Sequence, residues 1–381
     1  MKMNRELVMI PGPTPVTEPI RNEMERETAA FKDPNFIEDF QQVISDLKNL
    51  WGSSEVFVVA GSGTLSMEMA ISNTLKKSDP VLVISHGFFG DRMAELCERK
   101  GLEVDVLSCE WGKAVPVEEV EKKLSNKNYR AVTVTHVDTS TGTKAPLEEL
   151  GKLLDKHQDT LFIVDGVCST AGEPEFINEM GIDILLTASQ KAFGVPPGLA
   201  IVWASDKALK RREKIGEISE YYADFNKWLP IMNDPSKYFG TPPVNLIWAL
   251  KKSLEFIKTE GLKERFKRHQ VRGKAIQKAL EGIGLNILAE EGARASTISN
   301  ALYPEGIDDT FRKVLKEEGV VVAGGLGPYA DKLFRLGHMG NIDINELVTV
   351  ISSIERTLFR LDYPVEFGKG VNIFLDNIMR N

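Results

Sequence analysis

One unit recurs along the chain between about residues 56 and 204, and it constrains the fold more than any other feature of the sequence. Each copy has a short run rich in Val, Ile and Leu, then Gly or polar residues, then a segment with helical spacing, which is the pattern of an α/β layer. Several runs are apolar at nearly every position, as in strands that helices cover on both faces. We therefore predict an α/β fold with a mostly parallel, seven-stranded sheet, whose strands lie at 56–60, 81–85, 103–108, 131–136, 161–165, 182–187 and 199–204.

The sequence changes character after residue 205. Charged segments with helical spacing come first, at 207–214, 244–258 and 262–280. The remainder predicts strand, strand, helix, strand, strand and helix, at 285–288, 297–302, 308–318, 320–323, 333–336 and 343–361. The last of these helices has a clear start, because Asp343 can cap it together with Glu346. We expect an N-terminal extension (1–20), a large domain (21–255) and a small C-terminal α+β domain (256–381).

Composition excludes several classes of partner. The formal net charge of -8 makes nucleic acid a poor partner. No run approaches the roughly 18 apolar residues that cross a bilayer, and the first apolar run stops at Pro11, too early for a secretion signal. We therefore expect no membrane contact and a cytoplasmic location.

The metal-binding and disulfide chemistries are also disfavoured. Cys97, Cys109 and Cys168 are odd in number and have no CxxC spacing, so we expect neither a disulfide framework nor structural zinc. We interpret all three as ordinary core or surface thiols. The five histidines show no metal-ligand spacing either, and we expect no metal site.

The first candidate for chemistry is Gly61-Ser62-Gly63-Thr64, which lies between a predicted strand and a helix that should start near Leu65. Small residues at a helix N-terminus let backbone N–H groups approach an anion, so the segment could hold a phosphate. The alternative is a tight turn with Thr64 as the helix cap. A dinucleotide site is disfavoured, because position 66 is Ser and the next strand leads into His86.

The second candidate is a pair of residues that follow two predicted strands, Asp165 and Lys191. The carboxyl ends of the strands form the edge of an open α/β sheet where ligands bind. Taken alone, Asp165 could merely cap the turn at Gly166, and Lys191 could be solvated. Together with the anion site, however, they match the needs of pyridoxal phosphate (PLP): a seat for its phosphate, a carboxylate for its ring nitrogen and an amine for its Schiff base.

With these residues in place, the chain resembles the class V aminotransferases of the fold-type I PLP-dependent enzymes, within them the alanine–glyoxylate/serine–pyruvate aminotransferase branch. The likeness runs over essentially the whole chain. Besides the segments above, it rests on Pro11-Gly12-Pro13-Thr14-Pro15, Gly87-Phe88-Phe89-Gly90-Asp91-Arg92, His136-Val137-Asp138-Thr139-Ser140-Thr141-Gly142, Val164-Asp165-Gly166-Val167, Ser189-Gln190-Lys191 with Pro196-Pro197-Gly198, Tyr238-Phe239-Gly240-Thr241-Pro242, Gly324-Gly325-Leu326-Gly327-Pro328 and Phe334-Arg335-Leu336-Gly337-His338-Met339-Gly340.

The resemblance implies roles around the cofactor. Lys191 would form the Schiff base and carry a proton between the substrate and the cofactor, and Asp165 would hold the ring nitrogen. Phe89 would stack on the ring, where the family usually has Trp. The remaining cofactor contacts would come from Ser62, Gly63, Thr64 and Gln190 at the phosphate, Thr139 near the ring oxygen and Val167 against the ring.

The resemblance also implies a homodimer, in which Tyr238 and Thr241 reach the phosphate of the neighbouring subunit. Arg335 would bind the substrate carboxylate, and the segment 11–14, which contains Gly12, would line the same pocket. The implied reaction moves the amino group of alanine or serine to glyoxylate or pyruvate by a ping-pong route.

Two alternatives remain on the sequence. A cysteine desulfurase would need a nucleophilic cysteine on a late loop, yet the last one is Cys168. A non-catalytic interaction protein on this fold would be expected to have lost Lys191 or Arg335, and both are present. The chain departs from its close relatives at Ala29-Ala30, where they often carry His-Arg, which leaves substrate preference open. Gly166 departs as well, and it suggests a slightly roomier cavity.

Overall fold

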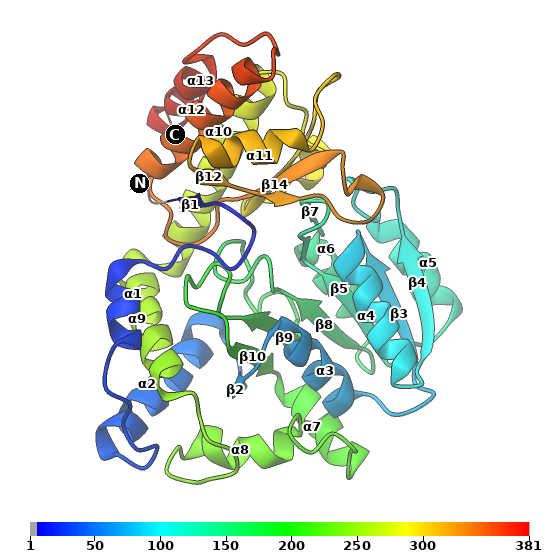
Figure 1. Cartoon of the computed structure of the whole chain (residues 1–381). Helices are drawn as coiled ribbons and strands as arrows, with labels where there is room; N and C mark the ends of the chain where they lie inside the picture. The colour runs from blue at the N-terminus through cyan, green and yellow to red at the C-terminus, as the bar shows by residue number, and fades with distance from the viewer. Residues whose placement is uncertain (1–5, 381) are drawn as a thin grey trace.

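The computed structural model describes residues 6–380 and is built around one large sheet (Figure 1). Its strand order is β2-β10-β9-β8-β5-β3-β4. Only β10 runs against its neighbours, and the other pairs in the sheet are parallel. The prediction of a mostly parallel, seven-stranded α/β fold is therefore confirmed. The strands are β2 (Glu55–Ala60), β3 (Pro80–Ser85), β4 (Glu103–Ser108), β5 (Ala131–Thr135), β8 (Leu161–Asp165), β9 (Ile184–Ala188) and β10 (Leu199–Ala204).

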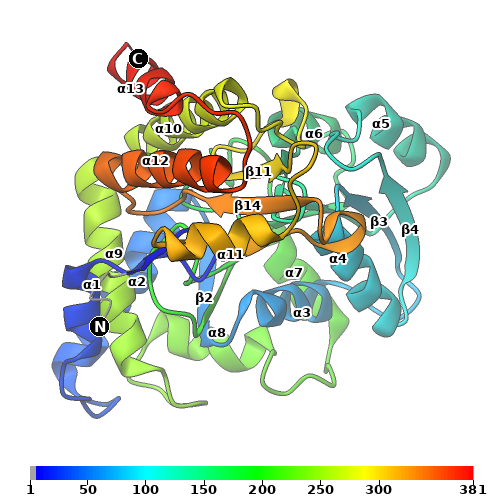
Figure 2. The same ribbon diagram turned by 45° about the horizontal axis from the view of Figure 1, so that its top comes forward.

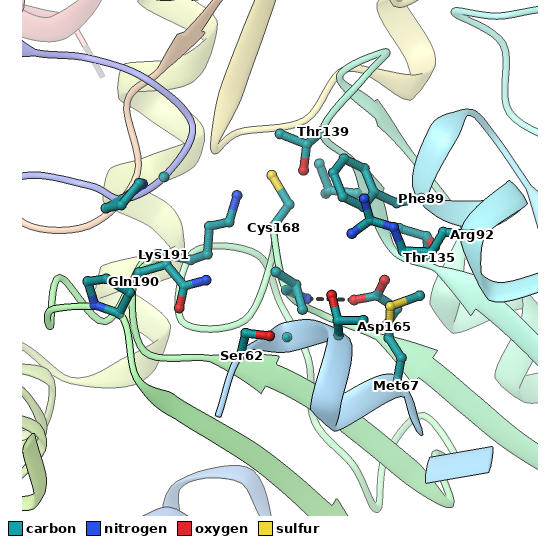
Figure 3. Close-up of a pocket in the computed structure, with 17 residues that line it drawn as sticks. Ser62, Met67, Phe89, Arg92, Thr135, Thr139, Asp165, Cys168, Gln190 and Lys191 are labelled. Atoms are coloured by element: carbon teal, nitrogen blue, oxygen red, sulfur yellow. Dashed lines mark hydrogen bonds between the residues drawn. The ribbon is translucent and has the colours of Figure 1, made fainter. Parts of the chain in front are cut away.

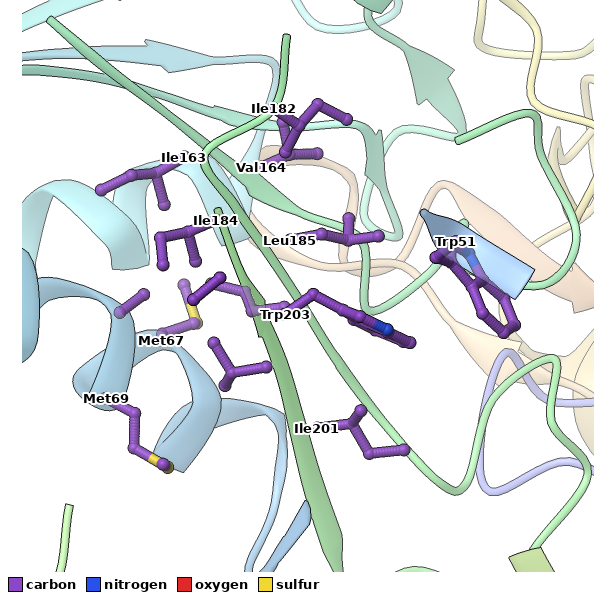
Figure 4. Close-up of a cluster of buried hydrophobic side chains, with 14 of the residues drawn as sticks. Trp51, Met67, Met69, Ile163, Val164, Ile182, Ile184, Leu185, Ile201 and Trp203 are labelled. Atoms are coloured by element: carbon purple, nitrogen blue, oxygen red, sulfur yellow. The ribbon is translucent and has the colours of Figure 1, made fainter. Parts of the chain in front are cut away.

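The sheet is buried because helices pack on both of its faces. Met67 of α3 and Trp51 of α2 lie on opposite sides of the central strands (Figure 4). The Trp51 ring packs against Trp203, with centroids 5.0 Å apart. Strands β5, β8, β9 and β10 are buried at every position, which explains their continuous apolar sequence. The helices of this part are α1 (Glu18–Met24), α2 (Pro34–Trp51), α3 (Gly63–Thr74), α4 (Phe88–Arg99), α5 (Val117–Asn126), α6 (Leu147–Leu154), α7 (Asp206–Ile215), α8 (Phe225–Asn233) and α9 (Val244–Glu260).

A second hydrophobic cluster lies in the C-terminal part, where helices pack on a small antiparallel sheet of order β11-β14-β13 (Figure 2). The strand β1 (Leu7–Val8), near the N-terminus, pairs here with β12 (Val320–Val321). The predicted cap of α12 is confirmed, since Asp343 and Glu346 form a reciprocal capping box. The other elements are α10 (Leu262–Gly282), β11 (Ile298–Leu302), α11 (Thr310–Glu317), β13 (Ala323–Gly324), β14 (Leu333–Gly337), α12 (Ile344–Arg360) and α13 (Lys369–Met379).

Some sequence predictions for this part were wrong. Segment 285–288 forms no strand but an isolated bridge between Ile287 and Ala301, because the chain turns away and Glu290 N–H donates to the Gly112 carbonyl. The helix α12 is followed by another, α13. This second helix was not predicted, although Val371, Phe374, Leu375 and Ile378 have helical spacing. Glu355 holds its start, because the Glu355 carboxylate accepts the N–H groups of Gly368 and Gly370.

The division into three parts stays a prediction. Two hydrophobic clusters accompany the two sheets, and residues 1–5 of the expected N-terminal extension lie outside the described part of the chain. Between residues 6 and 380, no helix combines the length and the apolar character that a bilayer crossing requires.

Candidate active site

A cavity of about 230 Å³ lies at the carboxyl ends of β2, β5, β8 and β9, the edge where open α/β sheets bind ligands. Ten of the residues predicted from the sequence line it (Figure 3). They are Gly12, Ser62, Gly63, Thr64, Phe89, Thr139, Asp165, Val167, Gln190 and Lys191. The structure thus brings Lys191, Asp165 and the expected anion-binding segment 61–64 to one cavity.

Lys191 follows β9, and the segment before α1 holds it. Its Nζ donates to the Pro11 carbonyl oxygen, and Thr14 Oγ1 donates to the Lys191 carbonyl at 2.7 Å. Gly12 packs so closely that a Cβ there would lie 2.7 Å from Lys191 Cδ. Desolvation lowers the pKa of Lys191 below its ordinary value, and the charge of Arg335 lowers it further, whereas Cys168 and Asp165 raise it. A lowered pKa makes the neutral, nucleophilic amine more available.

Asp165 ends β8 and is 2% exposed. Its Oδ1 accepts the Val167 N–H at 2.9 Å, so the carboxyl group also holds the turn that follows. Burial raises the pKa of Asp165 to about 7, and Asp138 raises it as well, while the Val167 N–H and Lys191 lower it. A buried acid with this pKa can share a proton with a ring nitrogen.

The expected anion-binding segment lies at the N-terminus of α3. The helix begins at Gly63 with Ser62 as its cap residue, and no side chain caps it. The expected start near Leu65 and the alternative of a Thr64 cap were therefore wrong. Uncapped N–H groups at a helix start attract an anion. A Cβ on Gly63 would lie 2.8 Å from Val167 Cγ2, so a glycine is needed for this close approach.

Phe89 and Thr139 form another part of the wall. Phe89 lies in the first turn of α4, and its ring meets Phe88 edge-on, with centroids 5.6 Å apart. The Arg92 guanidinium lies 4.8 Å from the centroid of the Phe89 ring. Thr139 follows the short strand β6 (Val137–Asp138), which pairs with β7 (Thr143–Lys144).

Three predicted site residues do not line the cavity. Arg335 lies on β14, where its Nε donates to the Gly324 carbonyl at 2.6 Å, and it is near enough for its charge to lower the pKa of Lys191. Tyr238 is 58% exposed and Thr241 is also exposed. The Tyr238 hydroxyl lies 3.4 Å from Thr241 Oγ1, so the two hydroxyls form a pair on the surface.

Sequence reasoning missed other lining residues, and Cys168 is the most consequential of them. Its interpretation as an ordinary thiol was incomplete, because its sulfur points into the cavity near Lys191 and Thr139 (Figure 3). Burial raises the pKa of the Cys168 thiol, and the charge of Lys191 opposes this, so the thiol stays protonated. The one feature of the sequence that pointed to the cavity was the position of Cys168, three residues after Asp165 at the end of β8. The others are Met67, Arg92, Thr135, Val137 and Pro197, while Pro13 lines the cavity as part of the expected segment 11–14.

Gly166 does not enlarge the cavity, contrary to expectation. It is not a lining residue, and a Cβ at this position would collide with Thr170 Oγ1 and lie 2.9 Å from Leu185 Cδ1. Packed side chains therefore fill the space that a larger residue would occupy. Within residues 6–380, no group of three or more His, Cys, Asp or Glu side chains is arranged to hold a metal ion.

The cavity fits PLP. Two buried polar atoms of its lining residues, Gln190 Oε1 and Thr135 Oγ1, have no protein partner, and such atoms call for a ligand. The uncapped helix start suits a phosphate, the Asp165 carboxyl group suits a ring nitrogen, and Lys191 suits an aldehyde. A mostly parallel sheet that brings these three groups to one cavity defines the fold-type I PLP-dependent enzymes.

Comparison with known proteins identifies the family within this class of enzymes. A family model described as aminotransferase class-V matches residues 21–330. The chain belongs to this family and is a PLP-dependent aminotransferase. The resemblance seen in the sequence is thereby confirmed.

The chain is similar to its relatives over nearly its full length. It is 36% identical to an uncharacterized aminotransferase of Methanocaldococcus jannaschii, over 99% of this chain and 98% of that protein. It is 35% identical to alanine–glyoxylate aminotransferase 1 of Saccharomyces cerevisiae, over 89% of this chain and 93% of that protein. The solved structure of an alanine–glyoxylate aminotransferase from Nostoc sp. matches with a TM-score of 0.89 at 30% identity, covering 94% of this chain and 96% of that one.

Proposed function

We propose that the enzyme moves the amino group of a small amino acid, alanine or serine, to a small 2-oxo acid, glyoxylate or pyruvate. The observation that carries the proposal is the convergence of Lys191, Asp165 and the α3 N-terminus on one cavity of about 230 Å³. The relatives named above that have a stated acceptor act on glyoxylate.

When bound, PLP supplies an aldehyde that captures an amino group and a ring that withdraws electrons from the substrate Cα. The chain supplies the rest. The α3 N–H groups with Ser62, Thr64 and Gln190 would hold the phosphate, and Asp165 would hold a proton at the ring nitrogen. Lys191 Nζ would take the proton from the substrate Cα and carry it to the cofactor.

The substrate is oriented by its carboxylate. The Arg335 guanidinium is fixed by its bond to the Gly324 carbonyl, and its free N–H groups can bind both oxygens of a carboxylate. The backbone at Gly12 packs on the Lys191 side chain and closes the pocket from the N-terminal side. Both the amino acid and the oxo acid carry this carboxylate, so one arginine serves both halves of the reaction.

We also propose that the active enzyme is a homodimer in which Tyr238 and Thr241 complete the phosphate site of the partner subunit. Aromatic side chains gather around them: Tyr238 packs on the half-buried Phe31, with ring centroids 5.1 Å apart, and Tyr221 packs on the half-buried Phe239, with centroids 5.2 Å apart. Tyr221 is 68% exposed. Aromatic residues on a surface are typical of protein interfaces.

The function of a cysteine desulfurase is disfavoured, because the thiol of Cys168 is held in its protonated form. This thiol lines the cavity, but burial raises its pKa, whereas a sulfur-handling cysteine needs an accessible thiolate. Free thiols at Cys97, Cys109 and Cys168 support a reducing compartment, and we propose a cytoplasmic location on that ground.

The test has two parts. Borohydride reduction of the PLP-loaded enzyme, followed by peptide mapping, should place a pyridoxyl group on Lys191. Single amino acids should then be screened for loss of the visible absorbance of the lysine-bound cofactor, and alanine or serine should react fastest. An adduct elsewhere would overturn the role of Lys191, and a preference for large donors would overturn the substrate class.

A further inference from the structure

The turn after β6 docks onto the start of α4 through one buried carboxylate, Asp138. Asp138 is 0% exposed. Its Oδ2 accepts the N–H groups of Phe89 at 2.9 Å and Gly90 at 3.1 Å. Its Oδ1 accepts the N–H of Ser140 at 2.9 Å and its hydroxyl at 2.6 Å. The carboxylate therefore ties together two segments about 50 residues apart in the chain.

This arrangement caps α4 from another element. The residue at the cap position is Gly87, which has no side chain to offer, and Asp138 supplies the missing acceptor. Ser140 Oγ accepts the Phe88 N–H at 3.0 Å and completes the cap. A negative group at a helix start is stabilised by the helix dipole. A Cβ on Gly87 would collide with Ser140 Oγ and lie 3.0 Å from Asp138 Cγ, so glycine is required for the contact.

The two segments carry two parts of the cavity wall. Phe89 donates its own N–H to Asp138, and Thr139 is the next residue after Asp138 in the turn. Both side chains line the cavity and lie on its same side in Figure 3. Asp138 does not itself line the cavity. It acts there through Phe89 and Thr139, and also through its charge, which raises the pKa of Asp165.

We propose that Asp138 is a positioning residue that sets the Phe89 ring and the Thr139 hydroxyl relative to each other, and so fixes where the cofactor ring can lie. The inference rests on the proposed roles of Phe89 and Thr139 as cofactor contacts. Four donors converge on a carboxylate that is fully buried. A shift of that carboxylate therefore moves both wall segments together.

The experiment compares D138N with S140A. The amide keeps the shape of the side chain but removes its charge and turns an acceptor into a donor that faces N–H groups. S140A removes the Phe88 contact and the hydroxyl bond to Asp138 Oδ1, and it leaves the bonds from the N–H groups of Phe89, Gly90 and Ser140 to Asp138. For each variant, PLP affinity is measured on the cofactor-free protein, visible circular dichroism on the loaded protein, and Tm on both.

We expect D138N to weaken PLP binding about tenfold or more and to change the circular dichroism of the bound cofactor. S140A should change the affinity less than about threefold, even where its loss of Tm is similar. In an F89A background, D138N should have a much smaller effect on affinity, because the ring it positions is gone. A D138N protein that loses Tm but binds PLP with unchanged affinity and dichroism would overturn the proposal.

If D138N does not fold, G87A provides a second route. Its added Cβ pushes the turn away while the charge at Asp138 stays, so the same loss of affinity and change of dichroism is expected. A folded G87A protein with the affinity and dichroism of the parent would contradict the inference. Failure of the parent enzyme to form the Lys191 adduct would count against the proposed function instead, so the two failures are distinguishable.

Discussion

In the proposed function, the amine of Lys191 serves both as the anchor of the cofactor and as the proton carrier, and its lowered pKa suits both tasks. Replacing it by Ala should leave PLP binding through the phosphate seat but lower kcat by more than about 10³-fold, because no other group at the cavity can take its place. Stopped-flow measurement of the half-reaction with alanine would show this. K313A, on the exposed Lys313, is the control and should match the parent.

The raised pKa of Asp165 has a consequence for stability. Its pKa in the folded, cofactor-free protein is about 7, above the usual value, so between about pH 4 and 7 the folded state binds the extra proton. Stability contributed by this group is therefore present at low pH and is lost as the pH rises through 7.

D165N should accordingly raise the Tm of the cofactor-free protein at pH 8 by several degrees, with little difference from the parent at pH 4.5. Thermal unfolding of the two proteins across this range is the measurement. The comparison with the parent at each pH cancels His86 and His338, whose lowered pKa values of about 4 and about 3 act in the opposite sense. A pH-independent difference would contradict the assignment.

Cys168 limits the room beside Lys191. C168A should raise the ratio of kcat/KM for a larger donor to that for alanine by about tenfold, since a pocket discriminates by roughly this amount for each methylene-sized group. C97A is a matched control, because Cys97 is equally buried but does not line the cavity. Both variants should lose a similar amount of stability. Only C168A should change the donor preference.

At the scale of elements, the start of α3 is the most sensitive part of the cavity. A Cβ on Gly63 would meet Val167 Cγ2 at 2.8 Å, so G63A should displace the helix start from the phosphate and weaken PLP binding by about tenfold or more. Equilibrium dialysis against PLP would measure the loss. G292A, at a glycine with open space around it, should leave the affinity unchanged.

Most of the large sheet, but only part of the cavity wall, could be predicted from the sequence. Each of the seven large-sheet strands was predictable. Burial on both faces leaves β5, β8, β9 and β10 with nearly continuous apolar runs, whereas the edge strand β4 is exposed or half-buried and mixes polar with apolar residues. Lys191 and Asp165 could be placed at one edge because parallel strands end together. Cys168 and Arg92 could not be assigned to the cavity, since their position depends on how a loop turns and on which face of α4 points inward. The cap that Asp138 forms on α4 joins segments far apart in the chain, and no local sequence pattern predicts it.

At the scale of the whole molecule, the proposed dimer makes activity depend on assembly. Tyr238 and Thr241 lie outside the cavity of their own chain, so an isolated subunit should lack part of the phosphate site. Y221A, which removes the most exposed aromatic side chain of this surface, should weaken association and lower PLP affinity together. Sedimentation velocity and PLP titration at matched concentrations would test this. Y329A removes a partly exposed aromatic residue that stacks on Trp111, and it should leave association intact.

The segment of residues 7–14 passes through both parts of the molecule. It begins with β1 on the small sheet's side, where Met9 accepts the Gly337 N–H at 2.8 Å. Five residues later, Thr14 donates its backbone N–H to the Gln190 carbonyl at 3.0 Å, next to Lys191. Cleavage of the chain within this stretch would therefore loosen the hold on Lys191 and the contact with the small sheet at the same time.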